Sequence, residues 1–172
     1  MTMKDAKNMH KNLVITSMDE QIRSWITNFL SKPNPLLNNF PPCPFAKKAL
    51  IEERVQIKKF TEWDELSHVA ADWDDSLDVA LWWFVDRDFE TMNNVKLQFN
   101  NVWRPHDMWL LMDHQDDVEF ISGVEMNFKL AGLLLLQRYS TLVDASKFLD
   151  RQGYYNCWNE VEQQFVHRRN NY

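Results

Sequence analysis

Hydrophobic positions recur at helical spacing near the start of the chain. Ser17 and Glu20 have the spacing of a capping box, which marks a helix start. Apolar residues then follow on one face of the predicted helix, at positions 22, 25, 26, 29 and 30. The helix is expected to end before Pro33, and residues 31–44, which hold five of the six prolines, are predicted to form a loop. Residues 1–16 show no such period and are predicted to be a flexible arm.

Short apolar runs in the middle of the chain predict strands. Residues 55–60 alternate between apolar and polar, as in a strand with one face in water. Residues 79–85 are continuously apolar, which is typical of a central strand covered on both faces. Residues 108–112 predict another buried strand, and residues 118–121 a strand at an edge.

Amphipathic segments between these runs predict helices. Residues 45–54 are good helix formers, so a short helix is expected after the proline-rich loop. Thr61 and Asp64 are expected to cap the next helix. Residues 89–103 carry apolar side chains at steps of three and four, which predicts an amphipathic helix of about four turns.

The C-terminal third begins with an ambiguous run. Residues 130–139 fit either a strand or a helix, and a strand is favoured because Thr141 and Asp144 can cap a helix that begins there and stops at Gly153. A last helix over residues 156–169 is expected to bury Trp158, Val161 and Phe165, with Val166 as a further candidate. Together these elements predict an α+β (or α/β) sandwich in which helices pack against a mixed sheet of about four to five strands, as one domain over residues 17–172.

Composition narrows the function classes. The chain is 45% hydrophobic and 26% charged, as expected of a globular protein. A formal net charge of −6 argues against binding to nucleic acid, because that binding depends on Lys and Arg displacing counterions. Two cysteines and the lack of a secretory signal favour a reducing cytoplasm. No apolar run approaches the roughly 20 residues of a membrane-spanning helix. The three glycines form no phosphate-binding motif, which weakens the case for nucleotide chemistry without excluding it, so the cofactor is unknown from the sequence.

Cys43 lies between prolines, just before the predicted short helix. A helix N-terminus lowers the pKa of a thiol and so favours the reactive thiolate. The alternative is that Cys43 is a small buried residue that packs the loop onto the core.

The segment WITNFLSKPNPLLNNFPPCPFAKKALIEERVQI resembles the start of an uncharacterised bacterial domain family with a Leu-Cys-Pro-Phe-Ala motif. The matching residues are Trp25, Cys43, Pro44, Phe45 and Ala46, and Pro42 stands where the family has Leu. A weaker similarity follows, in the order His114, Asp116, Asp117, Asn127, LLLLQRYS and Ala145. The resemblance implies an α+β fold, a bacterial or bacteriophage origin and a role for Cys43, but it names no activity.

The polar segment DHQDD after the third predicted strand supplies further candidate chemistry. Cys43 and His114 are a candidate nucleophile and base, with Asp116 orienting the imidazole. Asp113, His114 and Asp117 are a weaker candidate metal site, although their spacing matches no established motif and the alternative is a solvated acidic turn. Arg138, in a leucine-rich strand, requires a carboxylate partner or an anionic substrate unless it reaches the strand edge.

Two functions remain open from the sequence. The first is a small cytoplasmic enzyme that acts on a small molecule through Cys43, His114 and Asp116, with Arg138 binding the substrate. The second is a non-catalytic module in which the proline-rich loop 33–44 and the acidic surface bind a host or partner protein.

Overall fold

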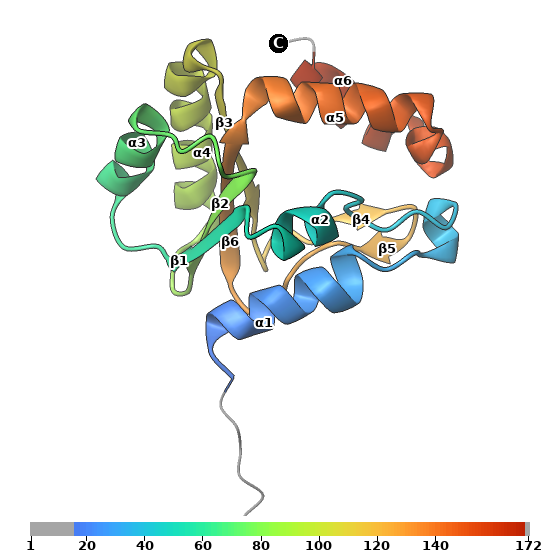
Figure 1. Ribbon diagram of the computed structural model, residues 1–172, viewed down its shortest axis with the longest axis horizontal. Coiled ribbons are helices and arrows are strands. Elements are labelled where there is room, and N and C mark those ends of the chain that lie inside the picture. Colours follow the sequence, from blue (N-terminus) through green and yellow to red (C-terminus); the bar gives the residue numbers. More distant parts are fainter. Residues whose placement is uncertain (1–15, 171–172) are drawn as a thin grey trace, which may run out of the picture.

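The computed structural model describes residues 16–170 and contains a four-stranded sheet with helices on both faces (Figure 1). The strands lie in the order β1 (Val55–Lys59), β2 (Val79–Phe84), β6 (Gly132–Arg138) and β3 (Met108–Asp113). β1 and β2 are parallel, and β6 is antiparallel to both β2 and β3. A second, two-stranded sheet is formed by β4 (Phe120–Ile121) and β5 (Val124–Glu125). The predicted α+β fold with a mixed sheet is confirmed.

Helices α3 (Trp63–Ala71) and α4 (Phe89–Trp103) cover one face of the sheet (Figure 1). A short 3₁₀ turn, η4 (Arg104–His106), continues α4. Alternate residues of β2 point into this layer, and Trp82 is fully buried there. The carboxylate of Asp88 caps α4 by accepting a hydrogen bond of 2.8 Å from the Thr91 N–H. This cap fixes the turn between β2 and α4.

The opposite face is covered by α1 (Met18–Trp25), its π-helical continuation η2 (Ile26–Leu30), and α2 (Ala46–Ile51). The predicted capping box is present, because the Ser17 N–H donates to the Glu20 carboxylate at 2.8 Å and the Glu20 N–H donates to the Ser17 hydroxyl at 3.2 Å. Ile22 and Ile26 then pack against this face of the sheet. Trp83, the neighbour of Trp82, also lies on this side.

Asn100 protects the outer edge of β3. Its side-chain amide donates to the Leu110 carbonyl at 2.9 Å and accepts from the Leu110 N–H at 2.7 Å. These two bonds imitate the pairing that a neighbouring strand would supply. A single buried side chain on α4 therefore satisfies backbone groups that the sheet leaves unpaired.

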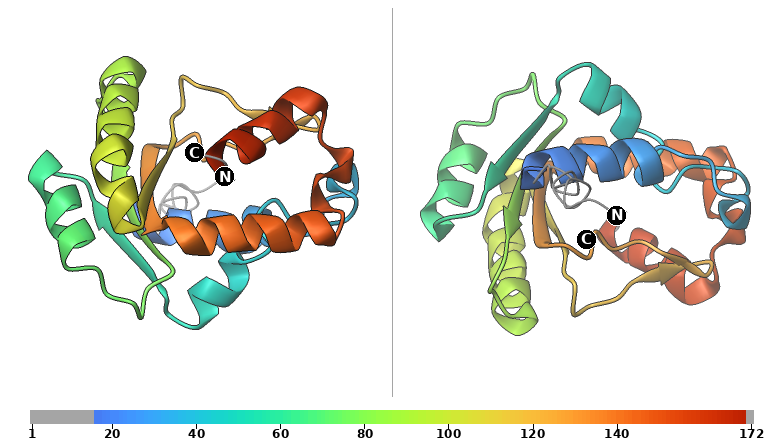
Figure 2. Two further views of the ribbon diagram at one scale, coloured as in Figure 1. Left: turned by 90° about the horizontal axis from the view of Figure 1, so that it is seen from above. Right: turned by 90° about the horizontal axis from the view of Figure 1, so that it is seen from below.

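Gly132 allows β6 to pack closely against β2. It pairs with Phe84 across the ladder, and a Cβ atom at this position would lie 2.1 Å from the Phe84 ring. Helix α5 (Tyr139–Arg151) follows β6 with no intervening loop. The chain then turns at Gly153, where φ is +75°, forms the 3₁₀ turn η5 (Tyr154–Cys157), and returns as α6 (Glu160–Asn170), which contacts α5 (Figure 2).

The proline-rich loop is packed against the C-terminal elements. Its 3₁₀ turn η3 (Pro35–Leu37) buries Leu37 completely against β4 and β5. The Phe40 ring contacts the Tyr154 ring with centroids 5.4 Å apart, and the Tyr154 hydroxyl donates to the Pro42 carbonyl at 2.6 Å. The loop is therefore a structural element of the fold.

Several expectations about element ends were wrong. Helix α3 has Glu62 at its N-cap with no side-chain cap, and α5 begins at Tyr139, before Thr141. The edge strand expected over residues 118–121 is reduced to β4 in the second sheet. Apart from Thr16, the predicted arm lies outside the described residues.

The interior predicted for the last helix was wrong at two positions, whereas Trp158 and Val166 do pack in a core cluster. Val161 and Phe165 are 64% and 67% exposed, while Val166 is buried. The face of α6 that packs on α5 is therefore rotated from the expected one. None of the helices within residues 16–170 combines the length and apolar character needed to cross a membrane.

Candidate functional site

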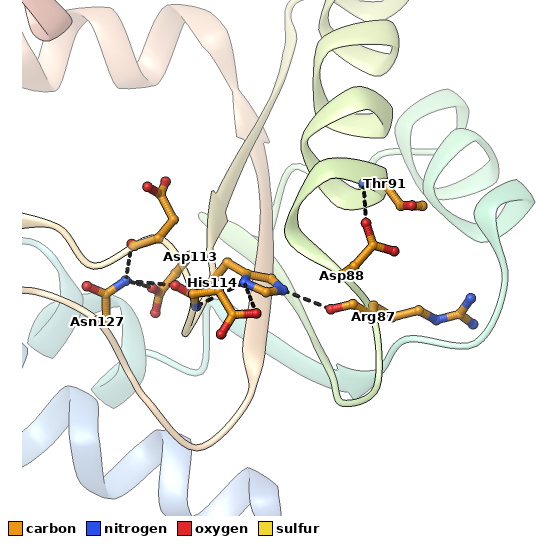
Figure 3. A network of polar contacts seen from close by, with 8 residues as sticks. Arg87, Asp88, Thr91, Asp113, His114 and Asn127 are labelled. Atoms are coloured by element: carbon orange, nitrogen blue, oxygen red, sulfur yellow. Dashed lines mark hydrogen bonds and ion pairs between the residues drawn. The ribbon is translucent and has the colours of Figure 1, made fainter.

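The candidate polar cluster at the end of β3 is held by Asn127 (Figure 3). Its amide nitrogen donates to the Asp113 carboxylate and to the carbonyls of His114 and Asp117, and its oxygen accepts from the Glu119 N–H. The second oxygen of Asp113 accepts from the Phe128 N–H at 2.8 Å. Asn127 is only 7% exposed. The Asp113 carboxylate therefore binds the backbone of a neighbouring segment.

His114 ties two turns together. It is 1% exposed, and its ring lies between those of Phe84 and Phe89, with centroids 5.8 Å and 5.7 Å away. Nδ1 accepts from the Asp116 N–H at 3.1 Å, so Nε2 carries the proton and donates to the Arg87 carbonyl at 2.9 Å (Figure 3). Both ring nitrogens are occupied by backbone groups.

Asp116 does not orient this imidazole through its carboxylate. The nearest carboxylate oxygen lies 3.8 Å from Nδ1, and its side chain is 71% exposed. Its contribution to the turn is the backbone N–H. The expected Asp–His–Cys relay therefore lacks its orienting hydrogen bond.

The acidic groups of this turn do not form a metal centre. Within residues 16–170, no group of three or more His, Cys, Asp or Glu side chains is arranged to hold a metal ion. Burial raises the pKa of Asp113, although hydrogen bonds from Phe128 and Asn127 oppose the shift. The ligand set expected at Asp113, His114 and Asp117 is not assembled, because backbone and amide groups hold the first two side chains.

Cys43 lies just before α2, as expected. The backbone N–H groups of Phe45 and Ala46 point at its sulfur and lower its pKa, but burial has the larger effect and raises the pKa above the usual thiol value. The predicted activation by a helix N-terminus is thus outweighed by loss of solvation. Such an environment favours the neutral thiol over the thiolate.

Cys43 and His114 lie on opposite sides of the sheet. The Cys43 N–H donates to the Leu30 carbonyl at 2.9 Å, and Leu30 packs with α1 and α2. The His114 ring contacts Phe84 and Phe89, which belong to the α3–α4 side. The structure therefore does not bring the candidate nucleophile and base together.

Arg138 is remote from His114, which follows the last residue of β3. It pairs with Met108 at the beginning of β3, whereas Asp113 ends that strand. Five residues of strand separate the two positions by about 17 Å. The guanidinium bonds the Asp75 carboxylate at 2.7 Å and 3.1 Å, which supplies the carboxylate partner that the sequence required.

A cavity of about 160 Å³ lies between α5 and α6. Its walls come from three elements: Ser146, Lys147 and Asp150 of α5, Tyr155 of η5, and Gln163, Val166, His167 and Asn170 of α6. The Asn170 amide oxygen is buried and has no hydrogen-bond partner among the described residues. A buried acceptor without a partner costs about 1–3 kcal/mol, so it marks a place where a bound molecule would be stabilised.

The guanidinium of Arg169 lies behind this cavity wall. It donates to the Ser146 hydroxyl at 2.6 Å and also bonds the Tyr155 hydroxyl. The Arg169 Nε is buried without a hydrogen-bond partner among residues 16–170. Burial lowers the pKa of Arg169 and raises that of Tyr155, so the phenol stays neutral. Arg169 is thus a largely buried cation whose described partners are uncharged.

Sequence reasoning missed this cavity. Basic residues such as those in the last turn of α6 are common at helix C-termini, because they interact favourably with the helix dipole. One signal was available: positions 163, 166, 167 and 170 share a helix face at steps of three and four, and three of them are polar. Polar side chains on the inner face of a packed helix indicate either a buried network or a ligand site.

Comparisons of the chain with protein-family models, with curated proteins and with solved structures found no match. The resemblance based on the residues around Cys43 therefore stays a prediction.

The role of His114 as a structural tie is testable by His114→Phe. This change keeps an aromatic ring between Phe84 and Phe89 but leaves the Arg87 carbonyl without its donor, so the free energy of unfolding should fall by about 1–3 kcal/mol. Asp116→Asn is the matched control and should leave stability nearly unchanged, because the backbone N–H is retained. Urea unfolding of both variants measures this, and equal stability of wild type and His114→Phe would contradict the structural role.

The raised pKa of the partly buried Cys43 is testable by alkylation of the folded Cys157→Ser variant with iodoacetamide between pH 6 and 10. A raised thiol pKa means less thiolate at neutral pH, so Cys43 should react at least about tenfold more slowly than free cysteine at pH 8. Its rate should still be rising above pH 9. A rate that levels off below pH 8 would show an activated thiolate and overturn this account.

Proposed function

We propose that the protein is a ligand-binding domain that takes up a small polar molecule in the cavity between α5 and α6. The observation that carries this proposal is the pocket itself: polar side chains from three elements line about 160 Å³, and the Asn170 amide oxygen lacks a partner within the described residues. The proposal keeps the small-molecule part of the sequence-based hypothesis. It gives no catalytic role to Cys43, His114 and Asp116, which are not assembled into one site.

The volume limits the size of the ligand. A cavity of about 150 Å³ in another protein accommodates benzene, a molecule with six non-hydrogen atoms. The α5–α6 cavity therefore suits a ligand of about five to seven non-hydrogen atoms. Very small ligands gain at most about 1.5 kcal/mol per such atom, and polar ones gain less, so a Kd in the high micromolar to millimolar range is expected.

Other predictions from the sequence accompany this function. The two cysteines are free in the structure, which supports a location in the reducing cytoplasm. The net charge of −6 supports the absence of nucleic-acid binding. A bacterial or bacteriophage origin rests on the sequence resemblance alone.

A second candidate function is favoured by a groove along α1 and η2. It has a volume of about 420 Å³ and is lined by Trp25, Phe29, Phe128 and Leu130, with neutral side chains such as Asn28 beside them. A π-helical turn, which η2 is, often marks a functional site. If the protein is an interaction module, an apolar segment of the partner would bind in this groove. The proline-rich loop is a poorer candidate because it is packed against the C-terminal elements.

The ligand-binding function is tested by titrating the full chain with a panel of small molecules, namely glycerol, acetamide, glycolate, phosphate and sulfate, while recording amide NMR spectra. At least one should give saturable shifts centred on Ser146, Gln163 and Asn170. Asn170→Leu, which replaces the amide by an apolar group of similar shape, should weaken or abolish the shifts. Gln164→Leu, on the exposed side of α6, should leave them unchanged. The absence of saturable shifts with every compound would contradict the proposed function.

A further inference from the structure

The charges around the α5–α6 cavity are unbalanced. Lys147 lines it as a cation and Asp150 lines it as a carboxylate. Arg169 adds a second cation immediately behind Ser146 and Tyr155. The one acidic side chain of the lining therefore faces two permanent positive charges.

The partners of Arg169 contrast with those of two other arginines, Arg54 and Arg138. Arg54 and Arg138 each bond a carboxylate, Asp78 and Asp75, at 2.7 Å. Arg169 instead bonds two hydroxyl groups, and the residues that act on it electrostatically are Tyr155 and Tyr139. A guanidinium stays protonated in proteins, so among residues 16–170 this largely buried charge has neutral groups as its direct partners.

An uncompensated buried cation stabilises an anion placed near it, and more strongly than it would in water because the local dielectric constant is lower. The cavity is the space next to this cation that a ligand can enter. Lys147, which follows Ser146 in α5, lines the cavity and supplies a second charge and up to three donors. The Asn170 amide can present its oxygen or, after a half-turn, its nitrogen, so it can match either an acceptor or a hydroxyl of the ligand.

From this arrangement we propose that the ligand of the α5–α6 cavity is a compact oxyanion, of the size of phosphate, sulfate or a short hydroxycarboxylate, held by Lys147 and Asn170 and by the field of Arg169. This inference rests on the proposed function, because it assigns the charge class of the molecule that the same cavity binds. Phosphate, sulfate and a short hydroxycarboxylate share a negative charge and several oxygen acceptors, which are the features that the two cations of the site recognise.

The charge class is tested with probes that share one shape. Sulfate, methanesulfonate, dimethyl sulfone and tetramethylammonium are tetrahedral and have five non-hydrogen atoms, while their charges run from −2 to +1. NMR titration of the full chain at constant ionic strength should give affinities that fall in this order. Sulfate should bind at least about tenfold more tightly than dimethyl sulfone.

Three variants connect this preference to the named charges. Lys147→Gln should reduce sulfate affinity by about tenfold, with little effect on dimethyl sulfone, whereas Asp150→Asn should increase sulfate affinity several-fold. Arg169→Gln should also weaken sulfate binding. Arg169 contacts α5, so Arg169→Gln can also disturb the packing of the two helices. The change in sulfate affinity is therefore interpreted only if the amide spectrum away from the cavity is unchanged. Arg168→Gln, its exposed neighbour, is the matched control and should bind sulfate like wild type.

The outcomes separate the two proposals. If dimethyl sulfone or tetramethylammonium binds in the cavity as tightly as sulfate, the oxyanion inference is wrong and the cavity remains a site for a polar molecule. Sulfate affinity that is the same in wild type, Lys147→Gln and Asp150→Asn would also overturn it. If none of these probes and none of the small-molecule panel shifts the cavity residues, the ligand-binding function itself fails.

Discussion

Strand β6 is hydrogen-bonded on both sides, to β2 and to β3, and its insertion between them determines where the C-terminal elements lie. The close approach of Gly132 to Phe84 fixes one end of this strand. At the other end α5 follows without a loop, so the direction of the strand sets the position of the helix (Figure 1). The turn at Gly153 then returns the chain along α5 as α6. The cavity between these two helices is thus a consequence of how one strand is placed in the sheet.

The need to pair buried backbone groups explains why polar residues such as His114 stabilise the fold and do not form a catalytic site. A buried carbonyl or N–H without a partner costs about 1–3 kcal/mol, so side chains that satisfy such groups are important for stability. His114, Asn127 and Asn100 each bond backbone groups that no strand or helix pairs. Their hydrogen-bonding capacity is used within the fold. Arg169 is the exception, because its buried charge has only neutral partners in the described structure.

The sequence predicted those elements whose pattern is local. The capping box at Ser17, the central position of residues 79–84 and the helix over residues 89–103 follow from short-range periodicity and were confirmed. The exposed side of α6 was not predictable in this way, because Val161 and Phe165 look like core residues until the packing against α5 is known. The pKa of Cys43 depended similarly on competition between burial and nearby N–H groups. Arg169 and Ser146 are brought together by tertiary structure, and no motif marks them.

The central claim, that the α5–α6 cavity binds an oxyanion, is tested most directly by a crystal structure determined with selenate, whose selenium gives an anomalous signal. The account predicts an anomalous peak inside the cavity, within hydrogen-bonding distance of Lys147 or Asn170 and next to the wall formed by Ser146. The same crystals grown with Lys147→Gln should show a weaker peak. A cavity without selenium, in crystals soaked at concentrations that saturate other surface sites, would contradict the claim.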